Sequence, residues 1–171
     1  MAASLRGKRC NLRGCGALIF VTVGTQLPFP RLISQMDSLA DRTDEPILAQ
    51  TGVAGSTVAM ESFPTCTAPE MEHFCDAARL IVAHAGIGTV LMARRLGKPL
   101  VVVPRSHELG EHRNNHQIAT ARSLAGRPGI RVAWDVADVE AFLSEDIEPP
   151  NAAPSDSYAS LLATLRDFAA A

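Results

Sequence analysis

Short runs of apolar residues recur along this chain, and polar or glycine-rich turns follow them. The runs are rich in valine, isoleucine and leucine, and charged residues are nearly absent from them. Continuous apolar runs of this length are typical of strands that are buried on both faces of a sheet. We therefore predict strands at residues 18–23, 47–50, 80–83, 100–103 and 130–133, with a weaker candidate at 58–60.

The segments between these runs repeat their apolar residues at helical spacing. Residues 28–40 place Leu32, Ile33, Met36 and Leu39 on one helical face, and prolines stand where that helix should begin. Strands that alternate with helices predict an α/β fold with a Rossmann-like, doubly wound parallel sheet. The remaining helices are expected at 69–78, 88–96, 111–124 and 136–143.

Ligands of doubly wound sheets bind outside the carboxyl ends of the strands. In this chain, four segments lie at or directly after the ends of predicted strands, and we expect them to lie together at the carboxyl ends of the strands. They are 24–25, 50–52, 84–89 and 104–116.

Both ends of the chain differ in composition from the middle. Residues 1–16 carry Arg6, Lys8, Arg9 and Arg13, and we interpret them as a flexible basic extension rather than a signal peptide, because no small-residue cleavage site follows. Residues 17–147 form the predicted domain. Residues 148–171 are predicted to be a proline-rich linker and a C-terminal amphipathic helix, which packs on its own sheet or reaches a partner. The apolar stripe of that helix is Tyr158, Leu161, Leu162, Leu165 and Phe168.

Composition excludes several classes of function. The net charge is −2 and aromatic residues make up 5% of the chain, so the sequence offers neither a basic footprint nor stacking platforms for nucleic acid. No stretch approaches the roughly 20 apolar residues of a membrane-spanning helix. The four cysteines (Cys10, Cys15, Cys66 and Cys75) are expected to be reduced thiols rather than a disulfide framework.

A glycine-rich turn stands between the apolar run 80–83 and a predicted helix. It contains Gly86, Gly88 and Thr89. A strand–turn–helix junction directs the free N–H groups and the positive dipole end of a helix toward one point, where a phosphate fits. Glycine lets the backbone approach such a ligand closely. The alternative interpretation is that these glycines serve packing alone.

A polar cluster at 106–117 follows the run 100–103. A metal site built from His107, His112 and His116 has poor ligand spacing, so we expect no metal there. The alternative is a hydrogen-bonding set for a polyhydroxylated ligand. Glu111, His112 and Arg113 also suit a solvated helix face.

Five segments in this order resemble the C-terminal domain of family 28 glycosyltransferases. The resemblance covers about residues 18–143 and is greatest to small stand-alone subunits. These are the exopolysaccharide glucuronosyltransferase subunit of the PssE type and the catalytic subunit of the split dolichol-pathway N-acetylglucosaminyltransferase. It implies a single half of a GT-B glycosyltransferase that binds a UDP-sugar as substrate, with no cofactor. The matching segments are 21–26, 50–52, 84–89, 96–105 and 110–121.

The resemblance also implies roles for residues at matching positions. Gly24 and Thr25 would lie in a loop facing the cleft, and His116 and Gln117 would bind the donor sugar. The diphosphate would be held by Gly86, Gly88 and Thr89.

One position departs from the family pattern. Met92 stands where relatives commonly have a glutamate that grips the ribose hydroxyls. Either other groups hold the ribose here, or the ribose is bound less tightly.

A GT-B active site lies between two halves, and this chain has length for one. The family therefore implies a membrane-associated, acceptor-binding partner subunit and inverting sugar transfer to a lipid-linked saccharide. This chain would then be cytoplasmic, held at the cytoplasmic face of the membrane through that partner. The helix N-terminus rather than a metal would stabilise the leaving group, and His84 or a partner group would accept the proton. A non-catalytic regulatory subunit and a nucleotide-sugar epimerase relative remain as alternatives.

Overall fold

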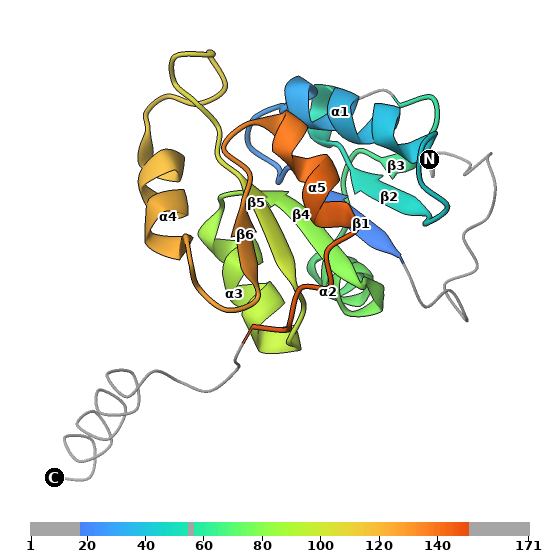
Figure 1. The fold of residues 1–171 in the computed structure, drawn as a ribbon. Coiled ribbons are helices and arrows are strands. Elements are labelled where there is room, and N and C mark those ends of the chain that lie inside the picture. The colour runs from blue at the N-terminus through green and yellow to red at the C-terminus, as the bar shows by residue number, and fades with distance from the viewer. Residues whose placement is uncertain (1–17, 55–56, 151–171) are drawn as a thin grey trace, which may run out of the picture.

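The computed structural model describes residues 18–54 and 57–150, and the predictions for residues 1–16 and for the C-terminal amphipathic helix lie outside these ranges. The described residues form a six-stranded sheet whose neighbouring strands all pair in parallel, in the order β3-β2-β1-β4-β5-β6 (Figure 1). The predicted doubly wound α/β fold is confirmed. The strands are β1 (Ile19–Thr22), β2 (Ile47–Gln50), β3 (Glu61–Phe63), β4 (Leu80–His84), β5 (Leu100–Val103) and β6 (Ile130–Val132).

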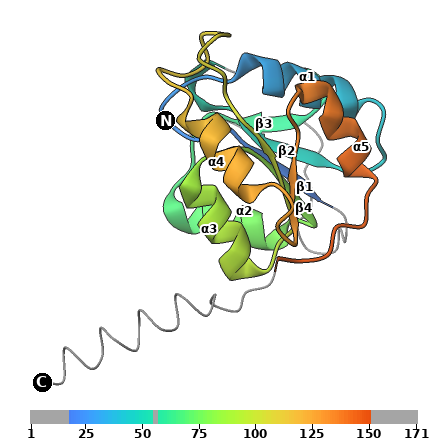
Figure 2. The ribbon, with the colours of Figure 1, turned by 60° about the vertical axis from the view of Figure 1, so that its left-hand side comes forward.

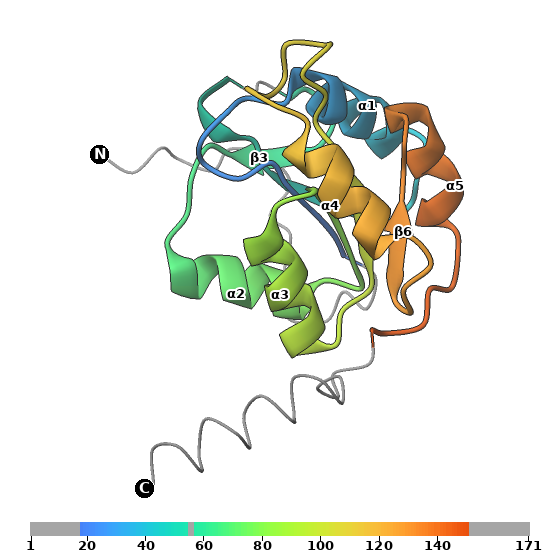
Figure 3. The ribbon, with the colours of Figure 1, turned by 90° about the vertical axis from the view of Figure 1, so that its left-hand side faces the viewer.

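Helices cover both faces of the sheet, because alternate residues of each strand point to opposite faces. One face packs against α1 (Pro30–Ala40) and α5 (Val139–Leu143), which the short helix η2 (Val136–Asp138) precedes. The other face packs against α2 (Ala68–Ala77), α3 (Ile87–Leu96) and α4 (His116–Leu124). Figures 2 and 3 show these two helical layers with the sheet between them. A further short helix, η1 (Gly52–Ala54), follows β2.

The strand predicted at 58–60 is wrong by a few residues. The backbone N–H groups of Val58, Ala59 and Met60 all donate to the carboxylate of Asp37, at 3.0–3.1 Å. These donors are therefore not available to a neighbouring strand. The strand begins at Glu61 instead and pairs with β2.

The order in which the chain adds strands to the sheet reverses between the parallel neighbours β1 and β4. From β1 the chain proceeds outward to β2 and β3, and from β4 it proceeds outward the other way to β5 and β6. Such a switch point is where doubly wound sheets bind ligands, at the carboxyl ends of the strands. Here those ends are followed by Gly24 and by the turn that contains Gly86.

Candidate functional site

The loop after β1 is held in place by one buried glutamine. The Gln50 Oε1 atom accepts from the Gly24 backbone N–H at 3.1 Å and from the Thr22 hydroxyl at 2.8 Å. Its Nε2 atom donates to the carbonyls of Gly24 at 3.1 Å and Pro64 at 2.8 Å. Gly24 has φ +74°, a backbone conformation that favours glycine. Gln50 therefore fixes the predicted cleft loop, in which Thr25 is exposed.

The N-terminus of α3 is open. Gly86 is its N-cap, and within the described residues no side chain caps the helix. Gly88 and Thr89 are the second and third helical residues, so their N–H groups belong to the first turn, which has no partners within the helix. A Cβ placed on Gly88 would meet nothing within 4 Å. The first turn of α3 therefore has N–H groups with no partner inside the helix, and the side-chain position of Gly88 beside them is empty.

The imidazole of His84 stands between the two predicted glycine segments. A Cβ on Gly86 would lie 2.3 Å from its Nε2 atom, and a Cβ on Gly24 would lie 2.8 Å from its Cε1 atom. Both distances are too short for a real contact. The absence of a side chain at Gly86 is thus required by His84, whereas the absence at Gly88 leaves space for something outside the fold.

The charge state of His84 is set by its surroundings. Burial, followed by the positive charge of Arg105, lowers the pKa of His84 from 6.5 to about 4. The ring is therefore neutral at pH 7. Its Nδ1 atom is buried and has no hydrogen-bond partner in the described part of the chain.

Arg105 is a buried cation beside this ring. Its Nη2 atom donates to the carbonyls of Val23 at 2.7 Å and Leu27 at 2.5 Å, and its guanidinium lies 5.1 Å from the centre of the Phe29 ring. Burial lowers the pKa of Arg105, yet arginine stays charged in proteins at neutral pH. Arg105 ends the segment 96–105 that resembles the family, but the sequence alone assigned it no role. The available signal was a charged residue almost directly after a buried strand.

The helix predicted at 111–124 begins later, at His116. The five preceding residues belong to a loop, because their polar groups bond locally or to distant elements. His107 N–H donates to Asn115 Oδ1, and the Glu111 carboxylate accepts from Ser106 N–H at 3.0 Å. Side chains that offer such bonds compete with helix formation.

The two predicted sugar-binding residues are placed differently. His116 is exposed at the first position of α4, whereas Gln117 is buried. The Gln117 Oε1 atom accepts from the Arg105 backbone N–H at 3.1 Å. That amide oxygen is therefore already used to anchor the loop after β5. Met92 is half-buried and packs on the α2–α4 side of the core.

The three histidines of the predicted polar cluster, His107 and His112 in the loop and His116 in α4, form no metal site. The Nδ1 atom of His107 lies 3.0 Å from the carbonyl of His112, and Nδ1 of His112 lies 3.0 Å from the carbonyl of Asn114. In residues 18–54 and 57–150, no group of three or more metal-ligating side chains is placed to hold an ion. No helix in these same ranges is both long and apolar enough to cross a membrane.

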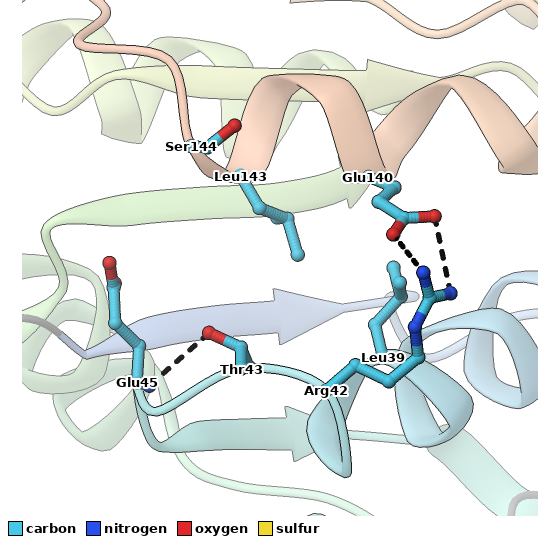
Figure 4. Close-up of a pocket in the computed structure, with 7 residues that line it drawn as sticks. All are labelled: Leu39, Arg42, Thr43, Glu45, Glu140, Leu143 and Ser144. Atoms are coloured by element: carbon cyan, nitrogen blue, oxygen red, sulfur yellow. Dashed lines mark hydrogen bonds and ion pairs between the residues drawn. The ribbon is translucent and has the colours of Figure 1, made fainter.

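A separate pocket lies toward the amino ends of the strands, between the C-terminal end of α1 and the helix α5 (Figure 4). It lies near the residues that lead into β2, far from the loops that follow β1 and β4. Arg42 and Glu140 form an ion pair at its wall. Its lining residues are Leu39, Arg42, Thr43, Glu45, Glu140, Leu143 and Ser144.

Comparison with solved structures finds glycosyltransferases. The glycotransferase of kitacinnamycin is 20% identical, with a TM-score of 0.59, and the match covers 98% of this chain and 42% of that chain. The solution structure of ALG13 is 18% identical, with a TM-score of 0.53 and coverage of 78% and 88%. The spinosyn rhamnosyltransferase SpnG, complexed with thymidine diphosphate, is 17% identical, with a TM-score of 0.55 and coverage of 77% and 36%.

The TM-scores show a shared fold, that of GT-B glycosyltransferase halves, and at such low identities they show the fold alone. The chain spans less than half the length of the kitacinnamycin enzyme and of SpnG. No curated protein matches the chain. The model of the glycosyltransferase family 28 C-terminal domain matches residues 18–168, which is most of the chain. The chain therefore belongs to the family of glycosyltransferase family 28 C-terminal domains.

Proposed function

We propose that this chain is the donor-binding, catalytic subunit of a two-subunit glycosyltransferase that uses a UDP-sugar. The observation that supports this most is the open N-terminus of α3 at the switch point, with free space beside Gly88. An uncapped helix N-terminus suits a diphosphate through its N–H groups and its dipole. SpnG, which shares the fold, holds thymidine diphosphate.

The charges around the turn support the same proposal. Arg105 contributes a buried positive charge next to His84, and His84 itself is neutral at pH 7. In our proposal, an anion at the turn is attracted by the helix dipole and by the positive charge of Arg105 beside His84. Charge that develops on a UDP leaving group is stabilised by the same groups without a divalent metal.

The proton of the acceptor hydroxyl must go to a base, and we propose a group on the partner. His84 is the other candidate. Its imidazole is neutral at pH 7, as a base must be, but a pKa of about 4 makes it a weak one. General bases work best when their pKa lies near the operating pH. In our proposal, His84 keeps the two glycine segments apart and lines the floor of the site.

Catalysis requires a second wall. A donor bound at the carboxyl ends of these strands is open to water on the side that faces away from the sheet. Closure against another protein surface excludes that water. We propose that the second wall is a membrane-associated subunit that brings a lipid-linked saccharide, and that sugar transfer inverts the anomeric centre. This places the chain at the cytoplasmic face of the membrane through its partner.

Transfer can be tested by co-expressing this chain with the product of the neighbouring reading frame. The co-purified complex is incubated with radiolabelled UDP-N-acetylglucosamine or UDP-glucuronic acid and a lipid extract. We expect label in the lipid fraction from the complex and none from either protein alone. Binding of a UDP-sugar without transfer by the complex would favour a regulatory subunit, and release of a free epimerised sugar nucleotide would favour the epimerase alternative.

A further inference from the structure

The loop between β5 and α4 is fastened to the helix on the other side of the sheet. α4 packs on one face, whereas α1 packs on the opposite face. Nevertheless, Arg31 of α1 donates from Nε to Glu111 Oε1 at 2.8 Å and from Nη2 to Glu111 Oε2 at 3.0 Å. Figure 1 shows this loop projecting beside the start of α1. The contact joins residues that are 80 positions apart.

The same carboxylate also closes the loop on itself. Glu111 Oε2 accepts from the Ser106 backbone N–H at 3.0 Å, and the Glu111 N–H donates to the Ser106 carbonyl at 3.0 Å. The Glu111 side chain is 9% exposed and that of Arg31 is 26% exposed. Pairing with Glu111 raises the pKa of Arg31. One ion pair thus fixes both the shape of the loop and its position against α1.

A second arginine makes a parallel connection. Arg105, at the start of this loop, donates to two carbonyls of the segment after β1. The guanidinium groups of Arg31 and Arg105 lie 5.6 and 5.1 Å from the centre of the buried Phe29 ring. In the sheet, β4 lies between β1 and β5. These connections therefore cross the carboxyl end of β4, where His84 and the glycine turn lie.

We propose that Arg31 and Glu111 are a positioning pair that holds the 106–115 loop over the donor site, so that the first turn of α4 meets the donor sugar. This inference rests on the proposed function, and in it the loop is organised before the ligand arrives and positions the first turn of α4 for the sugar. Neither residue contacts the ligand in this proposal. A bidentate arginine–carboxylate pair gives the geometric precision that such a role needs.

Loss of the pair releases the loop, and only the fraction of molecules with the loop in place binds the sugar tightly. Apparent affinity falls in proportion to that fraction. If the fraction falls to about one tenth, the affinity for a UDP-sugar falls about tenfold. The affinity for UDP alone stays the same, because the diphosphate is held by α3 rather than by this loop.

The test uses Arg31→Leu, which removes both bonds to Glu111, and a longer contact with Asp135 at 3.9 Å, while leaving the loop's own sequence unchanged. Arg31→Lys keeps the charge but not the two-bond geometry. The matched control is Arg79→Leu. Arg79 makes a similar arginine–carboxylate pair with Glu45 through three hydrogen bonds of 2.8–3.0 Å, and it also donates to the Leu143 carbonyl at 2.8 Å. Arg79 and Glu45 precede β4 and β2, so this pair lies at the amino ends of the strands. Calorimetry on the full chain measures the affinity for UDP, UDP-N-acetylglucosamine and UDP-glucuronic acid. Amide exchange of Ser106 and Glu111 reports the order of the loop without any ligand.

For Arg31→Leu we expect faster exchange at both amides, unchanged UDP affinity and about tenfold weaker binding of the sugar nucleotide that the wild type prefers. Arg31→Lys should give a smaller loss, and Arg79→Leu should give none. Equal losses for UDP and the UDP-sugar, or the same profile in both leucine variants, would overturn the positioning role. A wild-type chain that binds none of the three nucleotides would instead refute the proposed function.

Discussion

Acidification should destabilise this fold through His84, and the structure allows the size of the effect to be worked out. The pKa of this group is 6.5 when unperturbed and about 4 in the folded chain. Above pH 6.5 the ring is neutral in both states and contributes nothing. Between pH 6.5 and pH 4 the unfolded state binds more protons, so the free energy of unfolding decreases as the pH decreases. Below pH 4 both states are protonated and the loss is complete.

The expected magnitude follows from the two pKa values. Each pKa step corresponds to about 1.4 kcal/mol, so the contribution of His84 at pH 4.5 is at most about 2.5 kcal/mol. Partial exposure of the ring to solvent reduces that figure. A loss of this size is a large fraction of the stability of an ordinary domain.

Urea unfolding of the wild type and of His84→Asn, each at pH 7.5 and pH 4.5, isolates this contribution. Asparagine does not titrate, and its packing defect is the same at both pH values. We expect the wild type to lose about 2 kcal/mol more than the variant between the two pH values. If both proteins lose the same free energy, His84 does not have the lowered pKa on which our description of the site depends.

Four other predictions concern the site and its partner. Gly88→Ala should weaken UDP binding at least tenfold but leave the melting temperature unchanged or raise it, because alanine is favoured over glycine in a helix by about 1 kcal/mol and the space is open. Gly86→Ala should lower the melting temperature because its Cβ collides with His84, and a Gly88→Ala variant that is less stable than Gly86→Ala would refute the site geometry. His116→Ala should weaken UDP-sugar binding several-fold more than UDP binding, since a hydrogen bond to a sugar hydroxyl is worth roughly 0.5–1.5 kcal/mol; equal losses would exclude a sugar contact. Transfer by the complex with its partner should survive EDTA, and activity that disappears and returns with a divalent ion would contradict catalysis without a metal. Deletion of residues 155–171 should release the chain from the membrane fraction at little cost in melting temperature, whereas a truncated chain that still sediments with membranes would contradict partner binding through the tail.

The strands β1, β2, β4 and β5 were predictable because they are runs of mostly apolar residues that are buried on both faces of the sheet, whereas the half-buried and partly polar β3 was misplaced. The runs at 18–23 and 100–103 lie in the centre of the sheet, where helices cover both sides. The glycine turn was also predictable, because the apolar run 80–83 before it indicates a strand and the residues after it indicate a helix. Gly97, which ends α3 with φ +63°, is a local signal of the same kind.

The contacts that shape the site were not predictable, because they join residues far apart in the chain. Nothing near Asp37 shows that its carboxylate accepts three N–H groups from residues 58–60. The pair of Arg31 with Glu111 spans 80 residues, and it explains why the helix expected from 111 begins at His116. Local pattern reasoning assigns Glu111 to a solvated helix face, whereas tertiary structure uses it as an anchor.

The central claim is that the first turn of α3 binds the diphosphate of a UDP-sugar. The most direct measurement is an NMR titration of the ¹⁵N-labelled full chain with UDP and then with UDP-N-acetylglucosamine or UDP-glucuronic acid. We predict that the largest amide shifts occur at Gly24 and at Gly86, Gly88 and Thr89, and that sugar nucleotides add shifts at His116. Saturable shifts confined to the pocket around Arg42 and Leu143, or no shifts at millimolar UDP, would contradict the claim.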